Sequence, residues 1–184
     1  MTDAAEEHRA VAGVFTERVR GTPAGAWDNP SPCAGWRARD VVGHLVEWFP
    51  AFLRSGAGVM LPTGPSVDED PVAAWLVHSD GVQALLDDPA TPTRVLKDRH
   101  VGDLPLDRAV DAFYTGDVFL HTWDLARATD QDERLDPDRC ARMLEEMLPM
   151  DEALRASGHY GPRVEVPGDA DVQTRLLAFI GRSP

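Results

Sequence analysis

The chain has 184 residues, 43% of them hydrophobic, and its 31 acidic side chains outnumber 18 basic ones to give a formal net charge of −13. This length predicts one domain over residues 1–184, with a core large enough to fold without disulfides. The acidic balance argues against a nucleic-acid partner, because proteins that bind nucleic acids gather Lys and Arg to displace counterions from phosphates.

Membrane-spanning and secreted classes are also disfavoured. No apolar run approaches the ~20 residues that cross a bilayer, and the opening sequence MTDAAEEHRA lacks the basic and then apolar pattern of a signal peptide. The two cysteines, Cys33 and Cys140, lie far apart and outside any C-x-x-C spacing, so we expect two reduced thiols. Together these features predict a cytoplasmic protein.

Apolar residues at helical spacing predict two helices in the first third of the chain. The first covers residues 3–20 and ends at a glycine. Residues 22–36 are rich in proline and glycine but contain two tryptophans, which predicts an ordered connection rather than a regular element. The second helix begins at Arg39, and Pro50 is expected to kink it or start a new turn before two glycines end it.

The middle of the chain is predicted to be mainly helical. A third helix begins at Pro71, which suits the first turn of a helix, and stops before Pro89. Residues 94–96 favour a strand, but they are too few, and too charged afterwards, to predict a sheet. The longest helix then runs from Pro105 to about Thr129.

Two shorter helices complete the predicted fold. One starts at Asp136 and is broken by Pro149, and the other covers residues 172–180 with Asp169 and Asp171 as candidate N-caps. Long helices with little strand content predict an all-α fold, a helical bundle with additional short helices and the ordered Pro-rich connection.

Asp117 and His121 stand four residues apart on the predicted long helix, which brings a carboxylate and an imidazole onto one face. His44, in the apolar second helix, is the candidate third ligand, because bundles build metal sites from His and acidic residues on different helices. Three protein ligands leave a position open for water or substrate, which is typical of a catalytic metal site. The residues alone leave an alternative open, in which Asp117 and His121 form an ordinary surface pair and His44 is a hydrogen-bonded core histidine.

Three blocks of the sequence resemble a known family. They are WDNPSPCAGW at 27–36 followed by RDVVGHL at 39–45, GDVFLHTWDLARAT at 116–129, and the tail from YGP at 160–162 to GR at 181–182. On these blocks the chain resembles the DinB-like family that contains the N-terminal domain of mycothiol-dependent maleylpyruvate isomerase, in an actinobacterial branch of metal-binding proteins. The likeness spans nearly the whole chain.

The resemblance implies a DinB-like four-helix bundle that holds a divalent metal through His44, Asp117 and His121. It implies zinc, with nickel or iron as alternatives, and mycothiol as co-substrate of a transferase or isomerase acting on a small-molecule thiol or electrophile. An open zinc position lowers the pKa of a bound water or thiol and polarises carbonyls. The chain departs from the isomerase in two ways: the isomerase has Glu at the position of Asp117, and its further C-terminal domain has no room in 184 residues. No catalytic residue is assigned from the sequence.

Two carboxylates near these ligands have two candidate roles each. Asp40, one turn before His44, could orient that imidazole as an outer partner or could favour the start of its helix through the helix dipole. Asp124, three residues after His121, could accept the imidazole proton, but tying the long helix to the Pro-rich connection is the favoured role. Both stay as candidate supporting residues of the site.

Other nearby residues have a plainer favoured interpretation. Glu47 is a candidate alternative ligand that is expected to be solvated, and Arg127 could bind an anionic substrate or be solvated. Cys33 could be a reactive thiol near the metal, but packing is favoured for a cysteine between Pro and Ala. Core packing is expected for Trp36, Trp48 and Trp123. The histidines without a partner at ligand spacing are expected to be ordinary polar residues, namely His8, His78, His100 and His159.

Two functions of different class follow from the sequence. The first is the metal-dependent thiol transferase or isomerase, which the open three-ligand set favours. The second is a non-catalytic metal-binding or small-ligand-binding module, which could form a homodimer and which the missing second domain favours. A metal-free bundle that binds a small apolar ligand is a third hypothesis, and it requires that the three ligand side chains do not converge.

Overall fold

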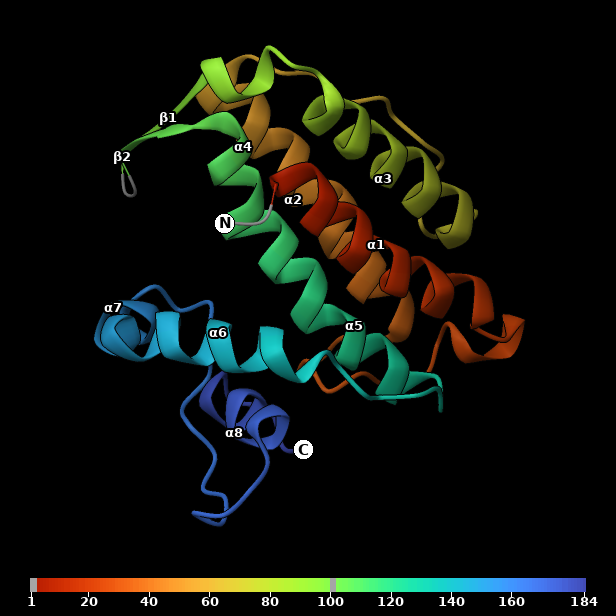
Figure 1. Ribbon diagram of the computed structural model, residues 1–184. Helices are drawn as coiled ribbons and strands as arrows, with labels where there is room; N and C mark the ends of the chain where they lie inside the picture. The colour runs from red at the N-terminus through yellow and green to blue at the C-terminus, as the bar shows by residue number, and fades with distance from the viewer. Residues whose placement is uncertain (1–2, 100–101) are drawn as a thin grey trace.

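The computed structural model of the protein describes residues 3–99 and 102–184 (Figure 1). Its described part is all-α apart from one small hairpin, which confirms the predicted fold class. The main body is built from α1 (Ala4–Gly21), α2 (Ala38–Ala57), α3 (Pro71–Asp87) and a long helical segment made of α4 (Leu106–Ala109), the π-helical turn η3 (Val110–Thr115) and α5 (Gly116–Ala128).

These segments form a four-helix bundle. Both α1 and α2 pack against α3 on one side and against α5 on the other, so the helices close a ring around a shared core. Fully buried apolar side chains from every helix fill it, including Phe15, Leu45, Trp75 and Val118. The bundle therefore places α2 and α5, which carry the candidate ligands, side by side.

Helix ends follow the capping residues in the sequence. The Asp3 side chain accepts a hydrogen bond from the backbone N–H of Ala5, and Asp70 accepts one from Ala73 at the start of α3, which has Pro71 in its first turn. The α2 helix continues without a break through Pro50, which lies in its interior.

The connection between α1 and α2 is ordered, as predicted. It contains the 3-10 turn η1 (Ala24–Ala26) and a short bridge that pairs Pro30 with Arg37. The Asn29 side chain donates a 3.0 Å hydrogen bond to the carbonyl of Ala128, the last residue of α5. This bond holds the connection, with its buried Cys33, against the end of α5.

The expectation that the β-favouring stretch at 94–96 forms no sheet is wrong. After η2 (Thr91–Thr93), β1 (Val95–Asp98) pairs antiparallel with β2 (Gly102–Pro105). Two short strands alone are marginal, but Leu96 is fully buried and β1 packs on α2, which supplies the missing stabilisation. His100 lies outside the described residues.

The C-terminal part lies beside the bundle next to α5 (Figure 1). It consists of α6 (Pro137–Met147), η4 (Leu148–Met150), α7 (Asp151–Ala156) and α8 (Val172–Phe179), with α6 packed on α8. As predicted, the helix that begins at Pro137 is interrupted at Pro149, in η4. Asp171 caps α8 as predicted, because its side chain accepts a hydrogen bond from the backbone N–H of Thr174. Among the described residues, no helix has the length and apolarity to cross a bilayer.

Candidate metal centre

Three side chains converge where α2 lies against α5. His44 comes from α2, while Asp117 and His121 come from successive turns of α5. The Nε2 atom of His44 lies 3.0 Å from Asp117 Oδ2, and the Nε2 atom of His121 lies 3.4 Å from Asp117 Oδ1. One donor atom from each residue lies within 4.8 Å of the other two, which is a spacing that one metal ion can bridge. The fold thus supplies the contact between helices that sequence spacing could not.

The three donors differ in exposure. Side-chain exposure is 31% for His44, 23% for Asp117 and 7% for His121. His121 therefore forms the buried wall of the site, and His44 and Asp117 form its rim. This arrangement is neither the surface pair nor the fully buried core histidine of the alternative interpretation, and it leaves one side accessible to a ligand.

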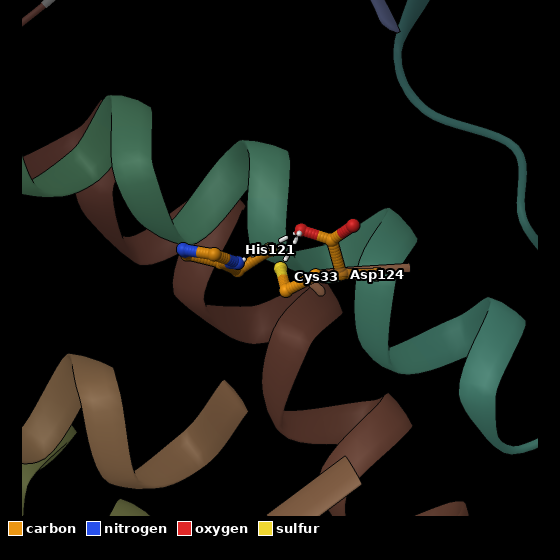
Figure 2. A group of neighbouring side chains, drawn as sticks. All are labelled: Cys33, His121 and Asp124. Carbon is orange, nitrogen blue, oxygen red and sulfur yellow. Dashed lines mark hydrogen bonds and ion pairs between the residues drawn. The ribbon is translucent and has the colours of Figure 1, made fainter. Parts of the chain in front are cut away.

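Asp124 determines which nitrogen of His121 faces the site. Its Oδ2 atom lies 2.9 Å from His121 Nδ1, and the carboxylate is completely buried (Figure 2). An ionised carboxylate only accepts hydrogen bonds, so Nδ1 carries the proton and Nε2 points toward Asp117. Histidine ligands of metals usually have such an outer carboxylate, which fixes both the tautomer and the ring orientation.

The charges of the site also suit a cation. Burial favours the neutral forms of both residues, yet the neighbouring carboxylates raise the pKa of His121 to about 10, while the hydrogen bonds of Asp124 lower the pKa of that carboxyl to about 2. Burial also opposes ionisation of Asp117, but the two imidazoles and Trp48 lower the pKa of its carboxyl. The metal-free site therefore attracts positive charge at His121 Nε2, the atom where a divalent ion would replace the proton.

Two tryptophans expected only to pack in the core lie at the site. The ring of Trp36 lies 5.0 Å from His44 and 5.7 Å from His121, measured between centroids. Trp48, one turn after His44, donates from Nε1 to Asp117 Oδ2 at 3.0 Å. Its i, i+4 spacing from His44 was the available sequence signal for this contact. Trp123, by contrast, is buried, as predicted.

A second group of candidate donors shares His121. Cys33, His121 and Asp124 come within ligand distance of one another, and Figure 2 shows the Cys33 sulfur directed at Asp124, where Sγ lies 3.4 Å from Oδ2. Arg182 also occupies this side, with Nη2 3.0 Å from Cys33 Sγ and 2.9 Å from Asp124 Oδ2. A guanidinium there repels a second cation, so the group with His44 is the better metal site and this group supports it.

The other candidate residues have partners of their own. Asp40 accepts hydrogen bonds from the Arg37 side chain and backbone in a capping box at the start of α2. Arg127 donates to Glu133 at 2.9 Å, and its guanidinium also lies over the ring of a tryptophan. Glu47 is exposed, in agreement with the solvated interpretation. Each of these contacts accounts for its residue without the metal.

Two histidines expected to be ordinary polar residues belong to the core instead. His8 and His78 are 0% and 3% exposed, and burial lowers the pKa of each to about 4. His8 Nδ1 lies 3.0 Å from the Thr115 hydroxyl, a partner that sequence spacing could not indicate because it comes from another helix. His159 is exposed, as predicted.

Fold and site together define a helical-bundle protein with a candidate His-Asp-His metal centre. The sequence model of the mycothiol maleylpyruvate isomerase N-terminal domain matches residues 8–126, a stretch that includes all three candidate ligands and Asp124. The chain belongs to this family.

Two curated relatives match nearly the full length of the chain. Two uncharacterized proteins of Mycobacterium tuberculosis, from strains CDC 1551 / Oshkosh and ATCC 25618 / H37Rv, are each 26% identical over 187 residues, covering 96% of this chain and 96% of the relative. No solved structure matches the chain.

Proposed function

We propose that the protein is a divalent-metal-dependent thiol transferase or isomerase that uses mycothiol as co-substrate. The observation that carries this proposal is the convergence of the His44, Asp117 and His121 donor atoms within 4.8 Å at a partly exposed junction of two helices. Membership of the mycothiol maleylpyruvate isomerase N-terminal domain family supports the choice of thiol. The two free cysteines accord with a reducing cytoplasm.

The donor set indicates the class of metal. Two imidazole nitrogens and one carboxylate suit zinc, with nickel and iron as alternatives, and an incomplete coordination shell admits a further ligand. A bound zinc ion would lower the pKa of a thiol or water at that open position and polarise a carbonyl. His44, Asp117 and His121 would hold the ion.

The surrounding residues would organise the reaction. Asp124 keeps the proton of His121 on Nδ1, so that Nε2 is free to act as a ligand. Trp48 holds Asp117 through its indole N–H, and Trp36 covers one side of both imidazoles, which limits the access of water. The exposed rim at His44 and Asp117 is where a small-molecule thiol and an electrophile would enter.

The metal is tested first. Protein purified without a metal-affinity tag is analysed for bound elements, alongside His44→Ala and His121→Ala. His159→Ala is the matched control, since His159 is exposed and lies outside the donor groups. We expect close to one divalent ion per chain in the wild type and the control, and little in the two site variants. Equal, negligible metal in all four proteins would exclude the site.

Activity is tested on the metal-loaded protein. Turnover of an electrophile such as maleylpyruvate in the presence of mycothiol is followed for the wild type and for His44→Ala. Both loss of the electrophile and loss of free thiol are measured, because isomerisation releases the thiol unchanged whereas transfer consumes it. We expect turnover that depends on the metal and disappears in the variant. Full metal occupancy without turnover would instead assign the protein to the non-catalytic metal-binding modules.

A further inference from the structure

The C-terminal segment reaches back to the candidate metal centre through one arginine. Arg182 follows α8, far outside the stretch matched by the family's sequence model, which ends at residue 126. Its Nε atom donates to Asp124 Oδ1 at 2.7 Å and its Nη2 atom donates to Oδ2 at 2.9 Å. This two-bond geometry fixes the plane of a carboxylate in a way that a single bond does not.

The contact is buried, so it fixes the orientation of Asp124. The side chain of Asp124 is 0% exposed and that of Arg182 is 18% exposed. A buried carboxylate that loses its cationic partner rotates toward other donors, because an unpaired buried charge is strongly unfavourable. Rotation would move the oxygen that receives the proton of His121 Nδ1.

The backbone of the tail is shaped to deliver Arg182. Gly181 has a positive φ of 89°, and a Cβ atom placed there would lie 2.9 Å from the Cα atom of Gly161. Only glycine fits both the conformation and the close approach. The backbone N–H of Arg182 then donates to the Leu177 carbonyl at 2.9 Å, which directs the side chain from the end of α8 toward α5.

We propose that Arg182 is a positioning residue of the metal centre, which holds Asp124 in the orientation that keeps His121 Nε2 directed at the metal. This inference rests on the proposed function. It makes residues beyond the family's shared region part of the site, so the C-terminal segment supplies a contact that the bundle lacks. Arg182 acts through Asp124 and His121 and need not touch the metal or the substrate.

The test compares Arg182→Met, Arg182→Lys and Arg163→Met with the wild type. Arg163 is the matched control, because it lies on the same C-terminal segment but pairs with Asp151 and stacks over Phe179. Gly181→Ala is a second way to separate Arg182 from Asp124, since the added Cβ displaces the tail while the guanidinium is kept. Circular dichroism establishes that each variant is folded.

Two measurements are made on each protein. The first is the side-chain NMR signal of the His121 Nδ1 proton in metal-free protein, assigned by its loss in His121→Ala. The second is the affinity for Zn²⁺ and Co²⁺ with the visible spectrum of the cobalt form. We expect Arg182→Met and Gly181→Ala to lose the proton signal, to bind metal roughly 10–100-fold more weakly and to change the cobalt spectrum. Arg182→Lys should show a smaller change in all three properties, because lysine restores charge but not the two-bond geometry.

The outcomes separate this inference from the proposed function. An unchanged Nδ1 signal and unchanged metal affinity in Arg182→Met would overturn the role of Arg182, even if the wild type binds metal. Equal losses in Arg163→Met would also overturn it, because the effect would then come from general loosening of the tail. A wild-type protein that binds no metal would exclude the proposed function, whereas the NMR signal would still decide whether Arg182 positions His121.

Discussion

Asp117 is the most heavily used side chain of the site. Its Oδ2 atom receives both His44 Nε2 and Trp48 Nε1 at 3.0 Å, and its Oδ1 atom lies 3.4 Å from His121 Nε2. A single carboxylate thus joins both histidines and carries the negative charge that a divalent ion would neutralise.

Asp117→Asn is expected to weaken metal binding by more than roughly 10–100-fold, which is the usual loss when a residue that only hydrogen-bonds to a metal ligand is replaced. The amide keeps the shape but removes the charge that attracts both the ion and the imidazoles. Metal affinity is measured by competition with a chromophoric chelator. Asp111→Asn is the control, because Asp111 lies on the same helical segment but outside the donor group. Unchanged affinity in Asp117→Asn would mean that the metal binds elsewhere.

At the scale of elements, the hairpin depends on its contact with α2. Gly56 lies in the last turn of α2, and a Cβ atom there would approach the side chain of Leu96 to 2.9 Å and the carbonyl oxygen of Lys97 to 3.1 Å. Leu96 is fully buried and the carbonyl belongs to a paired strand, so neither can move freely. The close packing of strand on helix explains why glycine stands there.

Gly56→Ala is therefore expected to destabilise the protein by about 1–3 kcal/mol, the usual cost of overpacking. Gly13→Ala is the matched control, because Gly13 also lies in a helix but has open space at its Cβ position. That change should stabilise the protein by about 0.5–1 kcal/mol, since alanine favours helix over glycine. Urea unfolding at pH 7 measures both. A Gly56→Ala protein as stable as Gly13→Ala would contradict the tight contact.

At the scale of the whole molecule, a layer of buried polar rings joins three parts of the bundle. The rings of His8 on α1 and His78 on α3 lie 5.8 and 5.4 Å from Tyr114 on η3, measured between centroids. Burial lowers the pKa of both histidines from 6.5 to about 4, so both are neutral in the folded protein at pH 7. The unfolded chain binds their protons more readily, which makes global stability dependent on pH.

Stability should fall as the pH drops from 6.5 to 4. Above pH 6.5 the histidines are neutral in both states and their contribution is complete, whereas below it the unfolded state gains protons that the folded state does not. Between pH 7 and pH 5 each histidine should lower the free energy of unfolding by about 2 kcal/mol. The free energy lost over this range in His78→Phe should be smaller than in the wild type by that amount, and His159→Ala should match the wild type. The free energy of unfolding is measured by urea titration at each pH, with a chelator present to keep the protein free of metal. An equal pH dependence in the wild type and His78→Phe would contradict the role of His78.

Local sequence signals predicted much of the fold and part of the site. Capping residues such as Asp171 marked helix starts, and the i, i+4 pair of Asp117 and His121 lay on one face as expected. Contacts between distant segments carried no such signal. His44 was a candidate ligand from its place in the apolar second helix and from the family resemblance, but no spacing showed that it reaches the pair. The hydrogen bond of Arg182 to Asp124 joins residues 58 positions apart. The hairpin was missed for the same reason, because its stabilisation comes from burial of Leu96 rather than from its own length.

The π-helical turn η3 (Val110–Thr115), between α4 and α5, sets the rotational phase of the metal ligands. A π turn contains one residue more than an α turn, and each residue of an α-helix rotates the chain by about 100°. The side chains of α5 are therefore rotated by about that angle from where an uninterrupted α-helix starting at Leu106 would place them. Leu106, at the start of the same helical segment, has a fully buried side chain. A single-residue deletion within the turn would keep the helix but rotate Asp117 and His121 away from His44. The extra residue thus allows one continuous helical segment to bury Leu106 in the core near the hairpin and still direct Asp117 and His121 toward His44.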